Sequence, residues 1–254
     1  MSDKGGRALV TGAARGIGRA IAVRLAADGY DVEMADLNAD AVEAAAADIR
    51  AAGCRAIAHS LDIRDRPAVA ALLQSLAPLE VLVNNAAIFS DKPFAALAEQ
   101  DFRDMYQTNL VGTFIVAQEA ARVMADGGRI VNIGSRSHLG GHNHAHYIAS
   151  KAAVAALTRA MAIDLGHRDI RVNCVAPGVI DTRLYRELSH ERKKQMLTMQ
   201  VTGRIGQPDD VARAVAFFAD PENAYVTGTV LLVDGGRSLG DRQEKSLLED
   251  ENAA

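Results

Sequence analysis

The sequence predicts an α/β fold in which one doubly wound parallel sheet of about seven strands carries helices on both faces. Short apolar runs alternate with longer amphipathic stretches, the pattern of repeated strand–helix units. Several of these runs are continuously apolar, as strands covered on both faces require. A glycine-rich segment follows the first run and opens the first helical stretch.

Seven segments have the length and composition of buried strands. They cover residues 7–11, 31–36, 55–60, 81–84, 129–134, 171–176 and 229–233. Helical patterns lie between them, most clearly at residues 17–27, 39–51, 67–76, 110–125 and 149–165. In the last of these, Val154, Leu157, Met161 and Leu165 form one apolar stripe.

Length and composition favour a single domain. The chain has 254 residues, of which 49% are hydrophobic and 4% aromatic, and no Pro/Gly/Ser linker or internal repeat divides it. We assign residues 1–239 to this domain. Residues 240–254 are polar and charged, and we expect this tail to be mobile or to dock on a neighbouring subunit.

Charge and patterning exclude several classes of partner. The net charge of −4 argues against nucleic acid, and no run approaches the roughly 18 apolar residues of a membrane span. The amino end lacks the basic-then-apolar layout of a secretion signal. Cys54 and Cys174 are too few for a disulfide framework, and Cys174, inside an apolar strand, is expected to be buried. We expect a cytoplasmic protein.

The glycine-rich segment spans residues 11–18 (TGAARGIG), with Gly12, Gly16 and Gly18 in the pattern G-x-x-x-G-x-G. Glycines at a strand-to-helix turn let backbone N–H groups approach a pyrophosphate, and the helix amino end adds positive potential. The first gap is one residue longer than in the usual dinucleotide fingerprint. The alternative is a turn that only reverses the chain, but its placement favours a dinucleotide site.

Asp36, at the end of the second strand, indicates which dinucleotide is bound. Its carboxylate can accept hydrogen bonds from both adenosine ribose hydroxyls and repels a 2′-phosphate, which favours NAD over NADP. Arg15 argues the other way, because a cation in the glycine loop attracts that phosphate. Asp36 could instead cap the next helix, although Asn38 is an equally good cap. Asp62, after the third strand, could bind the adenine amino group or cap a helix.

Tyr147 and Lys151 are four residues apart on a predicted helix, so their side chains share one face. A nearby cation favours the phenolate and lowers a tyrosine pKa from its usual value of about 10. Such a pair is a general acid/base that works near neutral pH.

In order along the chain, these motifs resemble those of the classical short-chain dehydrogenase/reductase family, from Arg7 to about Gly236. The marks are residues 11–18, 84–87 (NNAA), Asn109 in NLVG, Ser135, the Tyr147–Lys151 pair, 177–182 (PGVIDT), 226–228 (VTG) and 233–236 (VDGG). One departure is Ala87, where the family usually has glycine after Asn-Ala. The added methyl narrows the backbone's approach to a cofactor, and we expect NAD binding to survive it.

The resemblance implies a Rossmann-like fold and hydride transfer between NAD and a secondary alcohol or ketone. Tyr147 would exchange the hydroxyl proton, Lys151 would lower the tyrosine pKa and bind the nicotinamide ribose, and Ser135 would hydrogen-bond the substrate oxygen. Asn109, the fourth catalytic residue, would hold a water that links Lys151 to solvent. The cofactor contacts implied are Gly12, Arg15, Gly16, Ile17, Gly18, Asp36, Asp62, Ile63, Asn85, Tyr147, Lys151, Ile180 and Thr182.

Two of these assignments have a structural alternative. Thr182 and the Ile180 backbone would fix the nicotinamide carboxamide, but Thr182 could merely cap the next helix. Ser135 could simply end the fifth strand.

Four of the seven histidines lie between Ser135 and Tyr147, at His138, His142, His144 and His146. Their spacing in a loop is not a recognised metal-ligand pattern, and no acidic or thiolate ligand is close in sequence, so we expect no metal. The loop is either a solvated polar segment or a wall of the substrate pocket.

In the family, the residues two after the serine and three before the tyrosine commonly face the substrate. Here these are Ser137 and His144, which complete a substrate set with Ser135 and Tyr147. An imidazole-rich pocket favours a polyhydroxylated or anionic substrate. Phe89, Ile88 and Val179 would supply the apolar remainder. Residues 181–203 would form a flexible lid, and the alternative is that their methionines are plain core.

We therefore expect an NAD-dependent dehydrogenase of a polar secondary alcohol, such as a sugar, polyol or hydroxy acid. The runner-up is an NADPH-dependent ketoreductase of the 3-oxoacyl type, and a third hypothesis is a non-catalytic NAD-binding sensor. The resemblance also implies a homotetramer, or a dimer, formed through the helices that precede and carry the catalytic residues. Ala152, Ala153, Ala155 and Ala156 would permit close helix approach there.

Overall fold

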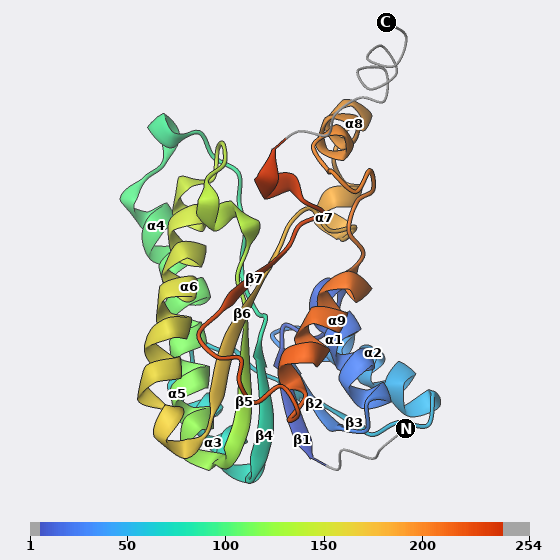
Figure 1. Ribbon diagram of the computed structural model, residues 1–254, viewed down its shortest axis with the longest axis vertical. Coiled ribbons are helices and arrows are strands. Elements are labelled where there is room, and N and C mark those ends of the chain that lie inside the picture. Colours follow the sequence, from blue (N-terminus) through green and yellow to red (C-terminus); the bar gives the residue numbers. More distant parts are fainter. Residues whose placement is uncertain (1–5, 241–254) are drawn as a thin grey trace, which may run out of the picture.

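A seven-stranded parallel sheet runs through the molecule in the order β3-β2-β1-β4-β5-β6-β7 (Figure 1). The structure is a computed structural model that describes residues 6–240. The strands are β1 (Arg7–Thr11), β2 (Asp31–Asp36), β3 (Ala56–Ser60), β4 (Leu79–Asn84), β5 (Met124–Ile133), β6 (Arg171–Pro177) and β7 (Val230–Val233). The strand order reverses between β1 and β4, and a ligand crevice forms at the carboxyl ends of strands at such a switch point.

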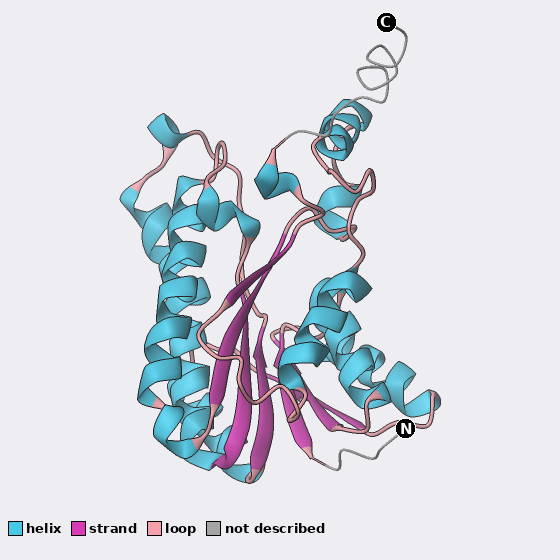
Figure 2. Ribbon diagram, in the orientation of Figure 1, coloured by secondary structure: helices cyan, strands magenta, loops and turns pink. Residues whose placement is uncertain are grey.

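Helices cover both faces of the sheet (Figure 2). One face carries α1 (Gly16–Ala27), α2 (Ala39–Ala51) and α9 (Pro208–Ala219), and the other carries α3 (Arg66–Ser75), α4 (Glu99–Tyr106), α5 (Thr113–Val123) and α6 (Ala145–Asp164). Two hydrophobic cores result: Ala8 and Val10 of β1 pack into one and Leu9 into the other. This double burial explains the continuously apolar strands, and it confirms the predicted single-domain fold.

The helices that the sequence predicted less well have polar surfaces or irregular turns. The pattern at residues 110–125 predicted one helix, but residues Gln107–Gly112 form a π-helical turn, η2, and α5 begins only at Thr113. Helix α4 was not predicted because Met105 is its only buried residue. Helix α6 begins at Ala145 rather than residue 149, so it carries both Tyr147 and Lys151.

Short helices lie beyond the carboxyl ends of β6 and β7. After β6 these are α7 (Arg183–Arg186) and α8 (His190–Thr198), within the expected lid, and after β7 it is η5 (Arg237–Leu239). A further short helix, η3 (Arg136–Leu139), follows β5. Two further turns, η1 (Phe94–Ala96) and η4 (Gly166–Arg168), lie in connections. Of residues 6–240, no helix is long and apolar enough to cross a membrane. The charged tail, from residue 241 onward, falls outside the described residues.

Candidate active site

The glycine loop turns tightly from β1 into α1. Gly16 has a positive φ of +56°, and a Cβ added there would meet only the Thr182 side chain, 3.6 Å away. At Gly18 a Cβ would lie 2.1 Å from the carbonyl oxygen of Gly12, so only glycine fits. Gly16 therefore faces the Thr182 side chain directly.

The amino end of α1 is open to an anion. Arg15 occupies the N-cap position without a side-chain cap, and the first turn contains no acidic residue. By contrast, Asn38 caps α2 and Asp65 caps α3 through side-chain oxygens. Uncapped N–H groups at a helix amino end attract phosphate, so this terminus fits a pyrophosphate.

Asn85 holds the glycine loop in place through hydrogen bonds to its first residues. Its amide Nδ2 donates to the carbonyl oxygens of Thr11 and Gly12, at 3.0 Å each, and its backbone N–H donates to Thr11 Oγ1 at 3.0 Å. Sequence reasoning named Asn85 only as a cofactor contact. Its side chain also holds the ends of β1 and β4 together, a role that the resemblance alone did not indicate.

Asp36 faces the same loop. Its Oδ2 accepts a hydrogen bond from the Ala14 backbone N–H at 3.2 Å, and its Oδ1 accepts one from Asn38 N–H at 3.1 Å. The helix-cap alternative is wrong for Asp36, because Asn38 Oδ1 accepts from Ala41 N–H at 3.0 Å and caps α2. Arg15 is exposed, and within residues 6–240 it has no ion-pair partner.

Asp62 does not cap a helix either, because Asp65 takes that position in α3. The Asp62 carboxylate pairs with Arg64 through bonds of 2.7–3.1 Å, and that guanidinium lowers the pKa of Asp62. Ile63 is buried and packs so closely against Gly112 that a Cβ there would lie 2.7 Å from its Cδ1.

Ser135, Tyr147 and Lys151 converge at the carboxyl end of β5. Ser135 follows that strand, and its hydroxyl is hydrogen-bonded to the Tyr147 phenol. Lys151 is buried, and its Nζ donates to the carbonyl oxygen of Ile133 at 2.8 Å. Burial lowers the pKa of Lys151 to about 8. The alternative in which Ser135 merely ends a strand does not account for its bond to Tyr147.

The expected lowering of the tyrosine pKa is not seen. Burial raises the pKa of Tyr147, and the hydrogen bond with Ser135 opposes that rise. The Lys151 ammonium lies 5.9 Å from the centroid of the tyrosine ring, with its hydrogen bond directed to the β5 backbone. Desolvation is therefore the largest influence on this pKa, and Ser135 rather than Lys151 is the group that opposes it.

Asn109 lies fully buried in the π-helical turn η2. Its amide donates to the carbonyl oxygen of Ile88 at 3.0 Å and to Ser150 Oγ at 3.1 Å, while its Oδ1 accepts from Ile88 N–H at 2.8 Å. Ser150 in turn donates to the Tyr147 carbonyl oxygen at 2.8 Å. Asn109 thus ties the loop after β4 to the turn that carries Tyr147. Its water-mediated link to Lys151 stays a prediction.

The histidines of the loop before Tyr147 diverge. The His144 ring centroid lies 5.6 Å from that of Phe89 and 6.1 Å from that of Tyr147, and the Phe89 and Tyr147 rings are T-shaped with centroids 4.9 Å apart. His138 instead bonds the Ser135 carbonyl oxygen, and His146 is buried against Ser90. Across residues 6–240 no three His, Cys, Asp or Glu side chains are grouped as metal ligands.

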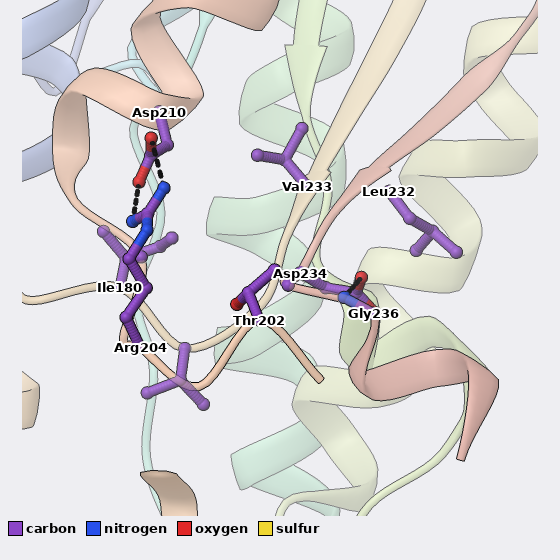
Figure 3. Close-up of a pocket in the computed structure, with 11 residues that line it drawn as sticks. Ile180, Thr202, Arg204, Asp210, Leu232, Val233, Asp234 and Gly236 are labelled. Atoms are coloured by element: carbon purple, nitrogen blue, oxygen red, sulfur yellow. Dashed lines mark hydrogen bonds and ion pairs between the residues drawn. The ribbon is translucent and has the colours of Figure 1, made fainter. Parts of the chain in front are cut away.

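A cavity of about 340 Å³ lies beside the site, between the ends of β6 and β7 and the start of α9 (Figure 3). Ile180 lines it, and Arg204 and Asp210 form one wall through an ion pair with atoms 2.6 Å apart. Thr182 follows at the start of α7 and makes no side-chain cap, so the helix-cap alternative is wrong for it. Sequence reasoning did not identify the β7 side of this cavity, including Asp234.

Fold and site together define an oxidoreductase that binds a nicotinamide dinucleotide. A family model described as enoyl-(acyl carrier protein) reductase matches residues 12–238. A short-chain dehydrogenase/reductase from Serratia marcescens superposes with a TM-score of 0.88 at 38% identity, covering 94% of this chain and 100% of that one. The chain belongs to the short-chain dehydrogenase/reductase family.

Two curated relatives act on acyl thioesters by name. The chain is 40% identical to a (2S)-[(R)-hydroxy(phenyl)methyl]succinyl-CoA dehydrogenase subunit of Thauera aromatica, over 91% of this chain and 96% of the relative. It is also 40% identical to the 3-oxoacyl-[acyl-carrier-protein] reductase of Staphylococcus aureus, over 90% and 96%.

Solved relatives hold either cofactor. A 7α-hydroxysteroid dehydrogenase complexed with NADH and 7-oxo glycochenodeoxycholic acid has a TM-score of 0.88 at 36% identity, covering 95% of this chain and 96% of that one. A metagenomic blue fluorescent protein in complex with NADPH has a TM-score of 0.85 at 39% identity, covering 92% and 98%.

Proposed function

We propose that this chain is an NAD-dependent oxidoreductase that interconverts a polar secondary alcohol and its ketone. The observation that carries this proposal is the hydrogen-bonded pair Ser135–Tyr147, with Lys151 one helical turn further along α6. The pair lies at the same edge of the sheet as the glycine loop. The intact set argues against a non-catalytic sensor.

The residues present fit a bound dinucleotide. The uncapped amino end of α1 and the glycine positions of the loop before it suit a pyrophosphate. Lys151 would bind the nicotinamide ribose, and Ile180 and Thr182 would orient the carboxamide. The further cofactor contacts proposed are Gly12, Arg15, Ile17, Gly18, Asp36, Asp62, Ile63, Asn85 and Tyr147. When bound, the nicotinamide accepts or supplies the hydride.

The chain itself handles the proton and the charge on the substrate oxygen. Tyr147 removes the proton from the alcohol during oxidation and returns it during reduction. The Ser135 hydroxyl stabilises the charge that develops on that oxygen. Asn109 and Lys151 would connect the phenol to solvent through a water. His144, Ser137 and Phe89 would form the substrate wall beside the phenol.

Asp36 supports NAD rather than NADP. Its carboxylate lies beside the glycine loop and would accept hydrogen bonds from ribose hydroxyls, while a 2′-phosphate would meet its negative charge. Arg15 is the competing influence. Its guanidinium has no acidic partner within the described residues, so it is available to a phosphate.

A second candidate, NADPH-dependent reduction of a 3-oxoacyl group, is favoured by the relatives' names. The acyl-carrier-protein reductase and the acyl-CoA dehydrogenase both handle thioesters. Both candidates use the same Ser135, Tyr147 and Lys151 chemistry, and they differ in cofactor and substrate.

Initial rates with both cofactors distinguish the candidates. NAD⁺ and NADP⁺ reduction would be measured against sugars, polyols and hydroxy acids, and NADH and NADPH oxidation against acetoacetyl-CoA. We expect at least a tenfold preference for NAD and turnover of a polar alcohol. A large preference for NADPH with acetoacetyl-CoA would establish the second candidate. NADH binding without turnover of any compound would indicate a sensor.

We also propose a homotetramer, or a dimer, with α6 in the interface. Ala156 and Ile163 are exposed on that helix, and the Ile163 side chain is 80% accessible in the monomer, whereas Ala155 is buried within it. Light scattering with size-exclusion chromatography tests this, and a monomer at micromolar concentration would contradict it.

A further inference from the structure

Two arginines from distant parts of the chain, Arg136 and Arg237, come together at the rim of the active site, and the charge of a third, Arg192, acts on Arg237. Arg136 directly follows Ser135, Arg192 lies on α8, and Arg237 begins η5 after β7. The Arg136 Nε donates to Ser238 Oγ at 3.3 Å, which joins η3 to η5. Figure 1 shows η5 between the loop at the amino end of α6 and the helices α7 and α8.

The three guanidiniums have no acidic partner among residues 6–240. Besides Ser238, Arg136 donates to the carbonyl oxygen of Gly140, and Arg192 donates to the Gln195 side chain at 2.6 Å. All of these acceptors are neutral. Neighbouring arginines on the same rim differ, because Arg186 pairs with Asp181 and Arg204 pairs with Asp210.

Asp234 is an acidic group whose charge acts on Arg237, but its oxygens already accept hydrogen bonds from the η5 turn. Its carboxylate accepts hydrogen bonds from Gly236 N–H at 3.1 Å, Ser238 N–H at 2.9 Å and the Ser238 hydroxyl at 2.5 Å. These bonds form the η5 turn. Asp234 therefore shapes the turn that presents Arg237, and it forms no salt bridge with any of the three arginines.

The cluster is electrostatically costly as it stands. Partial burial lowers the pKa of Arg237, and the charges of Arg136 and Arg192 lower it further, against the opposing effect of Asp234. Guanidinium groups present five donors each and bind carboxylate or phosphate bidentately. An anion placed among them would relieve the repulsion and satisfy the free donors.

We propose that Arg136, Arg192 and Arg237 form a site for an anionic group of the substrate, a carboxylate or a phosphate, held beyond the reacting carbon. This inference rests on the proposed function, because the site adjoins Ser135 of the catalytic set. It specifies the substrate as a secondary alcohol or ketone that carries such a group, and it excludes neutral polyols.

Direct binding tests the site without requiring turnover. The full chain, saturated with NADH so that the glycine loop is occupied, is titrated calorimetrically at low salt with 4′-phosphopantetheine, succinate and uncharged pantetheine. We expect at least one anion to bind at least tenfold more tightly than pantetheine. Binding of 4′-phosphopantetheine alone identifies a phosphate, and binding of succinate alone identifies a carboxylate.

Three variants connect the binding to the cluster. Arg237→Gln and Arg192→Gln should each weaken binding of the anion at least tenfold. Arg55→Gln removes an exposed arginine that precedes β3 and pairs with Asp31 of β2, and it should change that affinity less than twofold. Because Arg192 is exposed, its variant stays informative if Arg237→Gln fails to fold.

Unchanged affinity in Arg192→Gln, or no binding of either anion to the NADH-loaded protein, would overturn the inference. A failure of NADH itself to bind would instead overturn the proposed function.

Discussion

The Lys151 ammonium donates its hydrogen bond to the carbonyl oxygen of Ile133, 2.8 Å away, and lies 5.9 Å from the centroid of the Tyr147 ring. The lysine is thus anchored on the end of β5 while it faces the phenol one turn earlier on α6. Both groups are desolvated. Burial raises the pKa of Tyr147 and lowers the pKa of Lys151, so both shifts favour the neutral form of the side chain. The site therefore holds a charge at an energetic cost.

Lys151→Met should stabilise the protein at neutral pH while abolishing turnover. The folded-state pKa of about 8 lies below the ordinary value of 10.5, so the buried charge costs roughly 3 kcal/mol at pH 7, at about 1.4 kcal/mol per unit. Loss of the hydrogen bond to Ile133 destabilises the variant by about 1 kcal/mol and offsets part of this gain. The expected gain is a melting temperature several degrees above that of the wild type.

The gain should fade as the pH rises. Between pH 8 and 10.5 the unfolded lysine binds more protons than the folded one, so wild-type stability increases across this window relative to the variant. Melting curves at pH 7 and pH 9.5 measure the difference. Lys194→Met, which changes an exposed lysine, is the matched control. A difference in melting temperature between Lys151→Met and wild type that is the same at both pH values would contradict the account.

Asn85→Ala should weaken cofactor binding through the shape of the glycine loop. The change removes two amide bonds, to the partly buried carbonyl oxygens of Thr11 and Gly12, at a cost of about 1–3 kcal/mol. We expect NADH affinity to fall at least tenfold, measured by fluorescence titration. Asn223→Ala, which removes one exposed amide bond to Phe217, serves as control and should leave the affinity intact.

Asp36→Asn should shift the cofactor preference toward NADP. The substitution removes the charge that repels a 2′-phosphate and retains a side chain that bonds ribose hydroxyls. The ratio of kcat/KM for NAD⁺ to that for NADP⁺ is expected to fall at least tenfold. Asp31→Asn, at the other end of β2, should leave the ratio unchanged. An unchanged ratio in Asp36→Asn would contradict the assignment of Asp36 as the residue that sets the preference.

The sequence predicted the sheet well because strands buried on both faces read as uninterrupted apolar runs. The sequence did not predict α4, because its one buried residue forms no apolar stripe. It did not predict the π-helical turn at Asn109 either, because a change in the hydrogen-bond pattern of a helix does not alter hydrophobic periodicity. Helix α9 was also missed, although Pro208 and the cap from Asp210 mark its start.

Within the site, the four-residue spacing predicted that Tyr147 and Lys151 share one helix, and α6 carries both, while their catalytic role with Ser135 stays a prediction. The direction of the Tyr147 pKa shift was wrong, because burial depends on surrounding elements that spacing does not reveal. Arg136, Arg192 and Arg237 were not connected for a similar reason. They are far apart in the chain, and only the fold brings the charges of Arg136 and Arg192 to act on Arg237.

The most direct test of the central claim compares Tyr147→Phe with wild type in NAD⁺ reduction by the preferred alcohol, alongside NADH binding. Loss of the hydroxyl removes the proton acceptor, so the rate should fall by about 10³-fold or more. NADH affinity should stay within twofold, and Tyr225→Phe, which alters a fully exposed tyrosine, should match wild type in both measurements. A Tyr147→Phe rate within tenfold of wild type would contradict the assignment of Tyr147 as the proton-transfer group.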